Sequence, residues 1–268
     1  MFYQPKTIQE ALDLKAEFKE RATFIAGGTD LVVLMNQGKA APENLIDLTH
    51  VEALTRIRKH DGTLELAGNV TYAQCARLPI PCLAQASLSV GGPGIRELGS
   101  IAGNLATASP AGDGSTALLA LDAELLLRSA RGQRRVPLSK FFTGYRQTLL
   151  SSEEIIASVT VPTTYRTGWA KTGKRGAVNI SIVAAAVALT PESKARIALA
   201  SAAAIPIRCY GAEDFISRHG LDAGTARQAA EIVRGEVKPI DDQRASADYR
   251  THLSGVLVRR LLEGLVAS

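Results

Sequence analysis

The sequence predicts an α+β protein with two parts, residues 1–162 and residues 163–268. Strand-like alternating segments are interleaved with amphipathic helical segments in the first part. Pro162 follows a strand-like run and is a natural boundary. In the second part a few strand-like runs precede several helical ones, a pattern typical of a small α+β domain.

Composition and charge indicate an ordered globular chain. Of its 268 residues 46% are hydrophobic and 21% charged, so each part is long enough to bury a core. The net charge of +5 arises from 31 basic and 26 acidic residues spread along the chain. The densest basic cluster, Arg128–Arg135, has only four arginines and is more typical of a solvated hairpin. We therefore expect no nucleic-acid partner.

The few cysteines and histidines predict no metal or cluster site. Cys75, Cys82 and Cys209 lack C-x-x-C spacing, and the four histidines lie far apart. The start of the chain lacks the basic and apolar regions of a signal peptide, and the apolar stretches fall short of the ~18 residues of a membrane span. We expect a cytoplasmic protein without membrane contact.

In the first third of the chain, short helices alternate with short strands. Thr7 and Glu10 form a predicted capping box for a helix over 7–19. A strand at Ala22–Ala26 ends in Gly27-Gly28, and Thr29 or Asp30 is expected to cap the next helix. The predicted helix and strands that follow are Leu31–Gln37, Leu45–Leu48, Leu54–Arg58 and Leu64–Gly68.

The middle third combines helices, glycine-rich segments and strands. We expect Gly91–Gly94 to hold no regular element and residues 99–114 to form a loop. The predicted helices are Tyr72–Arg77, Pro81–Val90 and Ser115–Leu121, and the predicted strands are Glu124–Arg128, Arg134–Leu138 and Ile155–Val161.

The last third predicts a sheet covered by helices on one side. Its strand-like runs are Trp169–Thr172, Ile180–Thr190 and Arg196–Ala203. The predicted helices are Ala212–Arg218, Gly224–Arg234 and Ala247–Val266, the last with an apolar face.

Two glycine-bearing segments, Phe24–Leu31 and Ser100–Asp113, are the main candidates for a binding site. Glycine lets a ligand approach the main chain, and successive amides at such turns form concavities for anions such as a pyrophosphate. In the first segment the amides also face the start of a helix. Taken singly, each segment is more typical of a plain turn than of a binding site. Neither is a G-x-G-x-x-G, so a Rossmann site is not supported.

A competing candidate is Gly168–Arg175, which fits G-x-x-x-x-G-K. Arg175 stands where a P-loop needs Ser or Thr for magnesium, and no clear strand precedes Gly168. A nucleotide triphosphatase is therefore an alternative reading, and a solvated hairpin tip is the other.

Taken together and in order, the motifs of nearly the whole chain resemble the FAD-binding, medium subunit of the xanthine dehydrogenase and carbon monoxide dehydrogenase family of molybdenum hydroxylases. The blocks that carry the resemblance are Ala26–Asp30, Ile46–Leu48, Ile95–Asp113, Leu119–Ala123, Phe141–Arg146, Glu153–Ile156, Lys171–Arg175 with Ile180-Ser181, and Asp248–Arg250.

The resemblance implies a PCMH-type FAD-binding fold of the vanillyl-alcohol oxidase and CO dehydrogenase flavoprotein type over 1–162, with subdomains of about 1–55 and 56–162. Residues 163–268 would be a CO dehydrogenase flavoprotein C-terminal-like domain with a three-stranded sheet and helices. The implied FAD-binding residues are Ile25, Ala26, Gly27, Gly28, Thr29, Asp30, Leu31, Ser100, Ala102, Gly103, Asn104, Thr107, Ser109, Asp113, Ile156 and Lys171.

The resemblance also implies roles for these residues. Ala26–Asp30 would wrap the pyrophosphate, and polar residues of the 100–113 segment would contact phosphate, ribityl or ribose groups. Ile156 would line the flavin ring, and Lys171 would lie beside the isoalloxazine and favour its reduced, anionic form. No side chain is expected to act as a nucleophile or general acid.

The implied partners are a [2Fe-2S] small subunit and a molybdenum-cofactor large subunit, with electrons passing through FAD to NAD⁺ or another acceptor. One departure from the family pattern is Ala102, which stands where T-x-G-G-N has glycine. A scaffold subunit that has lost its flavin is therefore a further alternative. The extra cysteine-rich loop of some relatives is not present.

Overall fold

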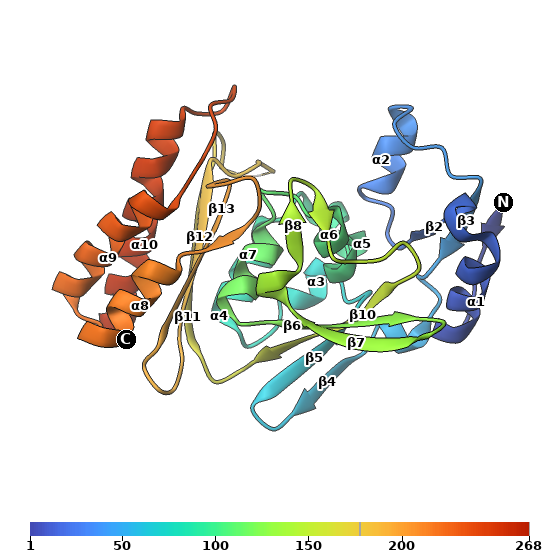
Figure 1. Ribbon diagram of the computed structural model, residues 1–268, viewed down its shortest axis with the longest axis horizontal. Helices are drawn as coiled ribbons and strands as arrows, with labels where there is room; N and C mark the ends of the chain where they lie inside the picture. The colour runs from blue at the N-terminus through green and yellow to red at the C-terminus, as the bar shows by residue number, and fades with distance from the viewer. Residues whose placement is uncertain (177, 268) are drawn as a thin grey trace.

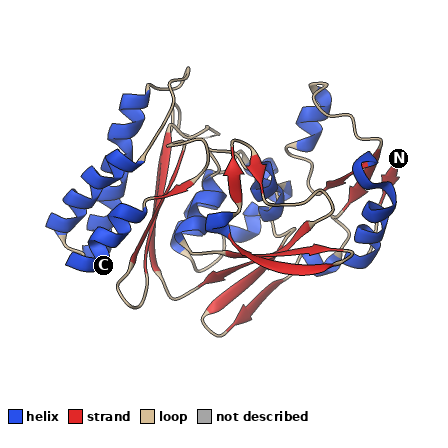
Figure 2. Cartoon of the chain, viewed as in Figure 1, coloured by secondary structure: helices blue, strands red, loops and turns tan. Residues whose placement is uncertain are grey.

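The computed structural model describes residues 1–176 and 178–267 and contains three main sheets set side by side along its long axis (Figure 1). A three-stranded sheet with α1 lies at the N-terminal end, a five-stranded sheet lies in the middle, and a four-stranded sheet with three helices lies at the other end (Figure 2). No helix in the described part of the chain is both long and apolar enough to cross a bilayer.

The N-terminal sheet is parallel. Its strands lie in the order β1 (Phe2–Tyr3), β3 (Asn44–Asp47) and β2 (Ala22–Ile25). Helix α1 (Ile8–Phe18) begins at Thr7, whose side chain accepts a hydrogen bond from the amide of Glu10 as predicted. The other half of the predicted capping box differs, because the Glu10 carboxylate accepts from the amide of Lys6. A 3₁₀ turn at Lys19–Arg21 leads into β2, and α2 (Leu31–Asn36) follows that strand.

The central sheet is antiparallel in the order β4-β5-β10-β6-β7. Alternating side chains of its inner strands, such as Leu64 and Leu66, are buried. The strand predicted at Leu54–Arg58 is present but shifted along the chain: a 3₁₀ turn ends at Leu54, and β4 starts only at Ile57. The strands are β4 (Ile57–His60), β5 (Thr63–Ala67), β6 (Glu124–Ser129), β7 (Gly132–Pro137) and β10 (Ile155–Pro162).

Five helices lie between the central and C-terminal sheets (Figure 1). They are α3 (Tyr72–Cys75), α4 (Pro81–Ser89), α5 (Pro93–Leu98), α6 (Ile101–Thr107) and α7 (Asp113–Ala120). A 3₁₀ turn at Leu138–Lys140 and a small hairpin, β8 (Phe142–Gly144) with β9 (Gln147–Thr148), complete this region.

Two of these helices contradict the predicted loops. Gly91–Gly94 was expected to hold no regular element, but α5 begins at Pro93, because proline at the first helical position has the required φ and needs no amide partner. Residues 99–114 were expected to form a loop, but Ser100 accepts a hydrogen bond from the amide of Gly103 and so starts α6. Short apolar helices of this kind leave little periodic signal.

The C-terminal sheet is antiparallel in the order β11-β12-β13-β14. The three predicted strands are present, and the two-residue edge strand β14 was not predicted. The elements are β11 (Arg166–Thr172), β12 (Val183–Leu189), β13 (Ala195–Ala200), β14 (Ile207–Arg208), α8 (Tyr210–His219), α9 (Ala223–Glu236) and α10 (Ala247–Ala267).

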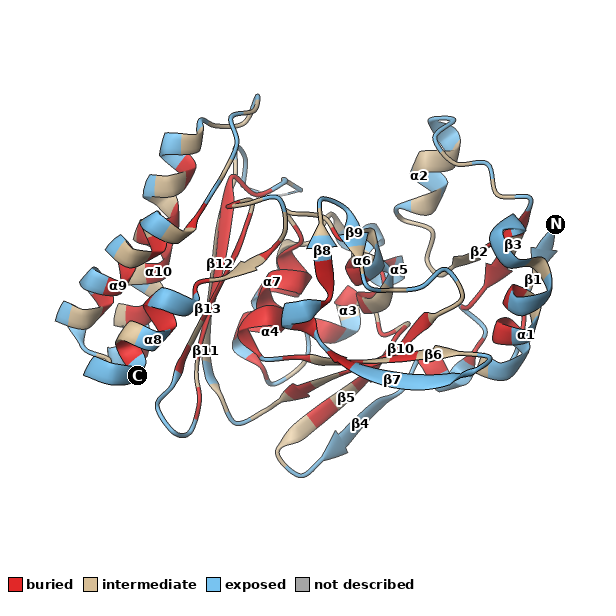
Figure 3. Ribbon diagram, in the orientation of Figure 1, coloured by how far each residue is buried: buried red, intermediate tan, exposed pale blue. Residues whose placement is uncertain are grey.

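This sheet is covered on both faces, not on one as predicted (Figure 3). Val183, Ala185 and Val187 pack in the core formed with α8–α10, whereas Ala186 and Ala188 pack in the core of the N-terminal part. Helix α7, all of whose residues are buried, lies against that second face. Small alanine side chains allow this close approach. The two parts of the chain therefore share a core, in which α7 packs against β12 and β13 and α4 packs against β11.

Candidate functional site

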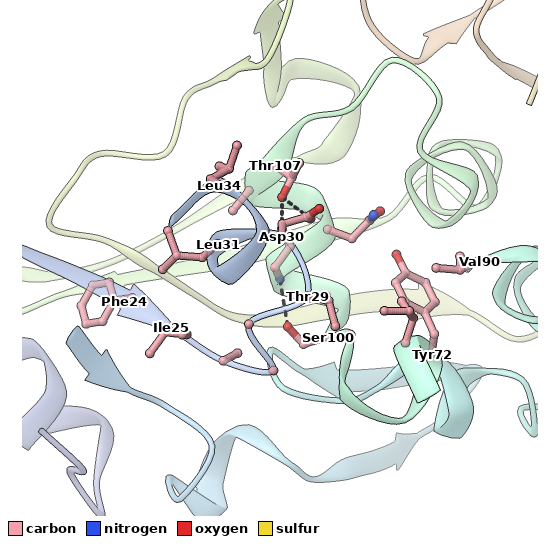
Figure 4. A pocket seen from close by; sticks show the side chains of 18 of the residues that line it. Phe24, Ile25, Thr29, Asp30, Leu31, Leu34, Tyr72, Val90, Ser100 and Thr107 are labelled. Atoms are coloured by element: carbon pink, nitrogen blue, oxygen red, sulfur yellow. Dashed lines mark hydrogen bonds between the residues drawn. The ribbon is translucent and has the colours of Figure 1, made fainter. Parts of the chain in front are cut away.

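The segment Ala26–Asp30 leaves the carboxyl end of β2 and forms a bare-backbone turn (Figure 4). Gly28 has a φ of +69°, and a Cβ on Gly27 would lie 1.8 Å from the carbonyl oxygen of Leu98. Among the described residues, the amides of Gly27, Gly28 and Thr29 donate to no protein oxygen. Three free donors in one turn form a concavity suited to an anion. We call Ala26–Asp30 the amide cradle.

Helix α6 faces the amide cradle with side chains (Figure 4). Thr107 Oγ1 donates a 2.8 Å hydrogen bond to Asp30 Oδ2 and so joins two segments that are 77 residues apart in sequence. Asp30 therefore does not cap α2 with its side chain, contrary to one predicted alternative. Asn104 Oδ1 accepts from the hydroxyl of Ser115.

The first amides of α6 are already used, so this segment is not a second amide concavity as we expected. The amides of Ile101 and Ala102 donate to the carbonyls of Val70 and Gly68, and that of Gly103 donates to Ser100 Oγ. The segment contributes side-chain groups instead, because the remaining amides of a regular helix donate to carbonyls four residues earlier in the chain.

A cavity of about 430 Å³ lies between the amide cradle and α6, a size typical of small-molecule sites. The predicted residues that line it are Ile25, Ala26, Gly27, Gly28, Thr29, Asp30, Leu31, Ser100, Gly103, Asn104 and Thr107. A second cavity, of about 130 Å³, is also lined by Ala26 and Ser100, and it adds Ala102 and Ile156. The two cavities thus bring thirteen of the sixteen predicted residues, from distant parts of the sequence, near one another.

Lys171 on β11 and Asp113 at the start of α7 form a buried ion pair, with 2.5 Å between Nζ and Oδ2. The Lys171 ammonium also donates to the carbonyl of Ser89, whose hydroxyl donates to the same Asp113 oxygen. Burial raises the pKa of Asp113 to about 6, against the opposing effect of Lys171. Asp113 Oδ1 is buried and has no hydrogen-bond partner among the described residues.

Lys171 also lines a third cavity, of about 840 Å³, between α4, α5 and the segment that follows β11. The described residues of its lining include four cationic side chains and no carboxylate, and we call it the cationic cavity. The four are Arg96, Lys171, Lys174 and Arg175. Apart from Lys171, these cations donate, within the described part of the chain, only to backbone carbonyls, at Val90, Gly91, Gln243 and Val178.

Ser109 is not among the residues that line these three cavities. Its hydroxyl accepts from the amide of Ala111, a local turn contact. Sequence reasoning missed Tyr72, which lines the 430 Å³ cavity and has a buried hydroxyl without a described partner. An aromatic residue after the Thr71 cap was the only signal, and it is equally typical of a core residue.

The structure also bears on the predicted P-loop alternative and on metal binding. Gly168–Lys174 cannot form a P-loop, because Gly168 lies inside strand β11, and the next regular element in the described chain is β12 rather than a helix. The nucleotide triphosphatase alternative is therefore wrong. Among residues 1–176 and 178–267, no group of three or more His, Cys, Asp or Glu side chains is placed to hold a metal.

Comparison with known protein families gives two matches that together cover most of the chain. Residues 1–164 match the FAD binding domain in molybdopterin dehydrogenase. Residues 170–265 match the CO dehydrogenase flavoprotein C-terminal domain.

Similar full-length proteins point the same way. The chain is 30% identical to the carbon monoxide dehydrogenase medium chain of Hydrogenophaga pseudoflava over 97% of this chain and 95% of the relative. It is 28% identical to a putative xanthine dehydrogenase FAD-binding subunit of Escherichia coli K12 over 100% and 96% of the two chains. A solved carbon monoxide dehydrogenase from Hydrogenophaga pseudoflava has a TM-score of 0.93 at 28% identity, over 99% and 96% of the chains.

Proposed function

We propose, from the premise that this chain belongs to the family of FAD-binding subunits of molybdenum hydroxylases, that it carries electrons through FAD from a [2Fe-2S] subunit to a separate acceptor. Membership makes the chain a subunit of an FAD-dependent oxidoreductase. The electron path, the acceptor and the individual binding residues are the parts that we propose.

The residues present fit the diphosphate of FAD. A diphosphate needs several donors at bare backbone, and the amide cradle has three free amides in a turn where a Cβ on Gly27 would collide with Leu98. This observation carries the proposal. We assign Ala26–Asp30 to the diphosphate and Ser100, Asn104 and Thr107 to the sugar and phosphate groups beside it.

The flavin end is proposed at Lys171 and Ile156, with Ser109 kept as a weaker candidate because of its local contact. When bound, FAD supplies the change between one-electron and two-electron transfer. The chain's own contribution is electrostatic: the Lys171 ammonium is buried, so it favours negative charge nearby more strongly than an exposed cation would. Asp113 and the Ser89 carbonyl hold that ammonium in place.

We propose NAD⁺ as the final acceptor, bound at the cationic cavity. The cavity holds four cations and no carboxylate, and one of the four is Lys171. The pyrophosphate of a nicotinamide dinucleotide carries negative charge that such a lining would attract. This part of the proposal predicts that NADH reduces the flavin, and that Lys174→Gln with Arg175→Gln raises the NADH concentration needed without changing FAD content.

The proposed partners are a [2Fe-2S] small subunit and a molybdenum-cofactor large subunit, since the similar proteins are named medium chains and FAD-binding subunits. We also keep as proposals the division into domains at residues 162 and 163 and a cytoplasmic location. The buried, unpaired thiols of Cys75, Cys82 and Cys209 support the latter.

The proposed FAD site is tested by expressing the full chain and measuring flavin per chain from its absorbance. Asp30→Asn replaces one carboxylate oxygen by an amide nitrogen and weakens the hydrogen bond that Thr107 donates to Asp30. We therefore expect lower flavin content than in wild type. Asp61→Asn, in the exposed turn between β4 and β5, is the matched control. A wild-type chain that takes up no FAD alone or with partner subunits would favour the scaffold alternative.

A further inference from the structure

Two buried polar atoms near the start of α7 have no protein partner among the described residues: the hydroxyl oxygen of Tyr72, a residue that lines the 430 Å³ cavity, and Oδ1 of Asp113. Tyr72 is 1% exposed and Asp113 is 6% exposed. A buried polar group without a partner is costly, so such groups are normally satisfied by a ligand or an ordered water. Two of them close together therefore point to a bound group.

The position of the Tyr72 hydroxyl is fixed by the surrounding backbone. Its amide donates to the carbonyl of Gly99, and Thr71 and Gln74 form a capping box around the start of α3. The hydroxyl ends against α7, where a Cβ on Gly114 would lie 2.2 Å from it. The residue next to Asp113 thus has no side chain, and the phenol reaches the start of α7.

The two atoms have complementary hydrogen-bonding roles. Burial raises the pKa of Tyr72 well above its usual value, and nearby Cys75, Asp113 and Asp30 act in the same direction, so the phenol stays a neutral donor. Asp113 Oδ2 is occupied by Lys171 and Ser89, which leaves Oδ1 as an acceptor. A group held between them must accept one hydrogen bond and donate another, which is the property of an alcohol hydroxyl.

We propose that Tyr72 and Asp113 together bind a ribityl hydroxyl of FAD, and that Tyr72 is a cofactor-binding residue. This inference rests on the proposed FAD site. Tyr72 and Asp113 connect the two ends of that site, because Tyr72 lines the same cavity as the amide cradle, whereas Asp113 pairs with Lys171 at the proposed flavin end. The ribityl chain is the part of FAD that joins the diphosphate to the ring.

The test is the Tyr72→Phe variant of the full chain, with Tyr145→Phe at an exposed position as the matched control. Binding of FAD, FMN, lumiflavin and ADP to flavin-free protein is measured by fluorescence or calorimetry. We expect Tyr72→Phe to weaken FAD and FMN about tenfold, the effect of one hydrogen bond. Lumiflavin lacks the ribityl hydroxyls and ADP lacks the ribityl chain, so their affinities should change less than about twofold.

Thermal unfolding of the flavin-free protein separates ligand binding from a structural role. Removing a buried hydroxyl that has no partner should raise the Tm of Tyr72→Phe by about 2–4 °C while FAD affinity falls. If Tyr72 served only packing, Tyr72→Phe would lower both the Tm and the FAD affinity. Unchanged FAD affinity in Tyr72→Phe, or an equal loss for lumiflavin or ADP, would overturn the inference. A wild-type chain that binds no FAD would instead defeat the proposed function itself.

Discussion

The Lys171 ammonium and the Asp113 carboxylate lie 2.5 Å apart and join β11 of the C-terminal sheet to the first residue of α7. Both side chains are almost fully buried, with 10% and 6% of their surfaces exposed. A buried ion pair makes little net contribution by itself, but each partner depends on the other for its charge. The pair therefore keeps a cation buried at the proposed flavin end of the site.

Lys171→Met should lower the free energy of unfolding by about 3–5 kcal/mol, because it leaves the buried Asp113 carboxylate without its cation. Adding Asp113→Asn removes that charge and should recover most of the loss. Urea unfolding of both variants, with exposed Lys59→Met as the control, measures the effect. Equal stability of Lys171→Met and Lys59→Met would show that the pair is not buried as described.

The stability contributed by Asp113 should fall as pH rises. Burial raises its pKa to about 6 in the folded chain, above its ordinary value of 3.8, so folding favours the protonated form. The contribution is complete below about pH 4 and is lost as pH rises through about 6. Asp113→Asn should remove this fall, so the difference between variant and wild-type Tm should change between pH 4 and 7. For exposed Asp61→Asn we expect the difference from the wild-type Tm to stay constant over this pH range. The same constant difference for Asp113→Asn would contradict the prediction.

Gly28→Ala should reduce FAD affinity far more than Gly38→Ala. Both glycines have nearly the same left-handed backbone, with φ of +69° and +68°, so alanine should cost each about 1–2 kcal/mol of stability. Gly28 lies in the amide cradle, where its Cβ would approach Val32 at 3.0 Å, whereas Gly38 has open space around it. Measuring flavin content per folded chain in both variants separates the loss of FAD binding at the amide cradle from the loss of stability. Equal losses would exclude a diphosphate at Gly28.

The parts of the fold that the sequence predicted well are those with a strong periodic or capping signal. The Thr7 cap and the alternating segment Ile155–Val161 correspond to α1 and β10. The short helices α5 and α6 were missed, because glycine and alanine leave no apolar periodicity and their formation depends on Pro93 and on the Ser100 cap.

The candidate site was predicted by motif but not by geometry. The amide cradle could be located from Gly27-Gly28 following a strand. The first amides of α6 donate to the carbonyls of Gly68 and Val70. The sequence could not predict these hydrogen bonds, because they depend on contacts between distant segments. The second covered face of the C-terminal sheet could have been predicted, because β12 is a continuous apolar run, the pattern expected of a strand that is buried on both faces.

A second buried charge network, centred on Arg208, should be essential for stability. The Arg208 side chain is 4% exposed and binds Glu213, Asp122 and the carbonyl of Leu119, so it links β14 and α8 to the turn after α7. Arg208→Met should lower the free energy of unfolding by about 3–5 kcal/mol, because Glu213 then stays buried without its cation. Arg208→Lys should retain only part of the stability that Arg208→Met loses, since lysine lacks the guanidinium fork.

The matched control is Arg218→Met, which breaks an exposed ion pair with Asp214 on the same helix. Such a pair is worth about 0–1 kcal/mol. Replacing Glu213 by leucine together with Arg208→Met should recover stability, since the unpaired carboxylate is then gone. Chemical unfolding that gave equal losses for Arg208→Met and Arg218→Met would mean that the linkage between α7 and the C-terminal sheet depends on the shared apolar core alone.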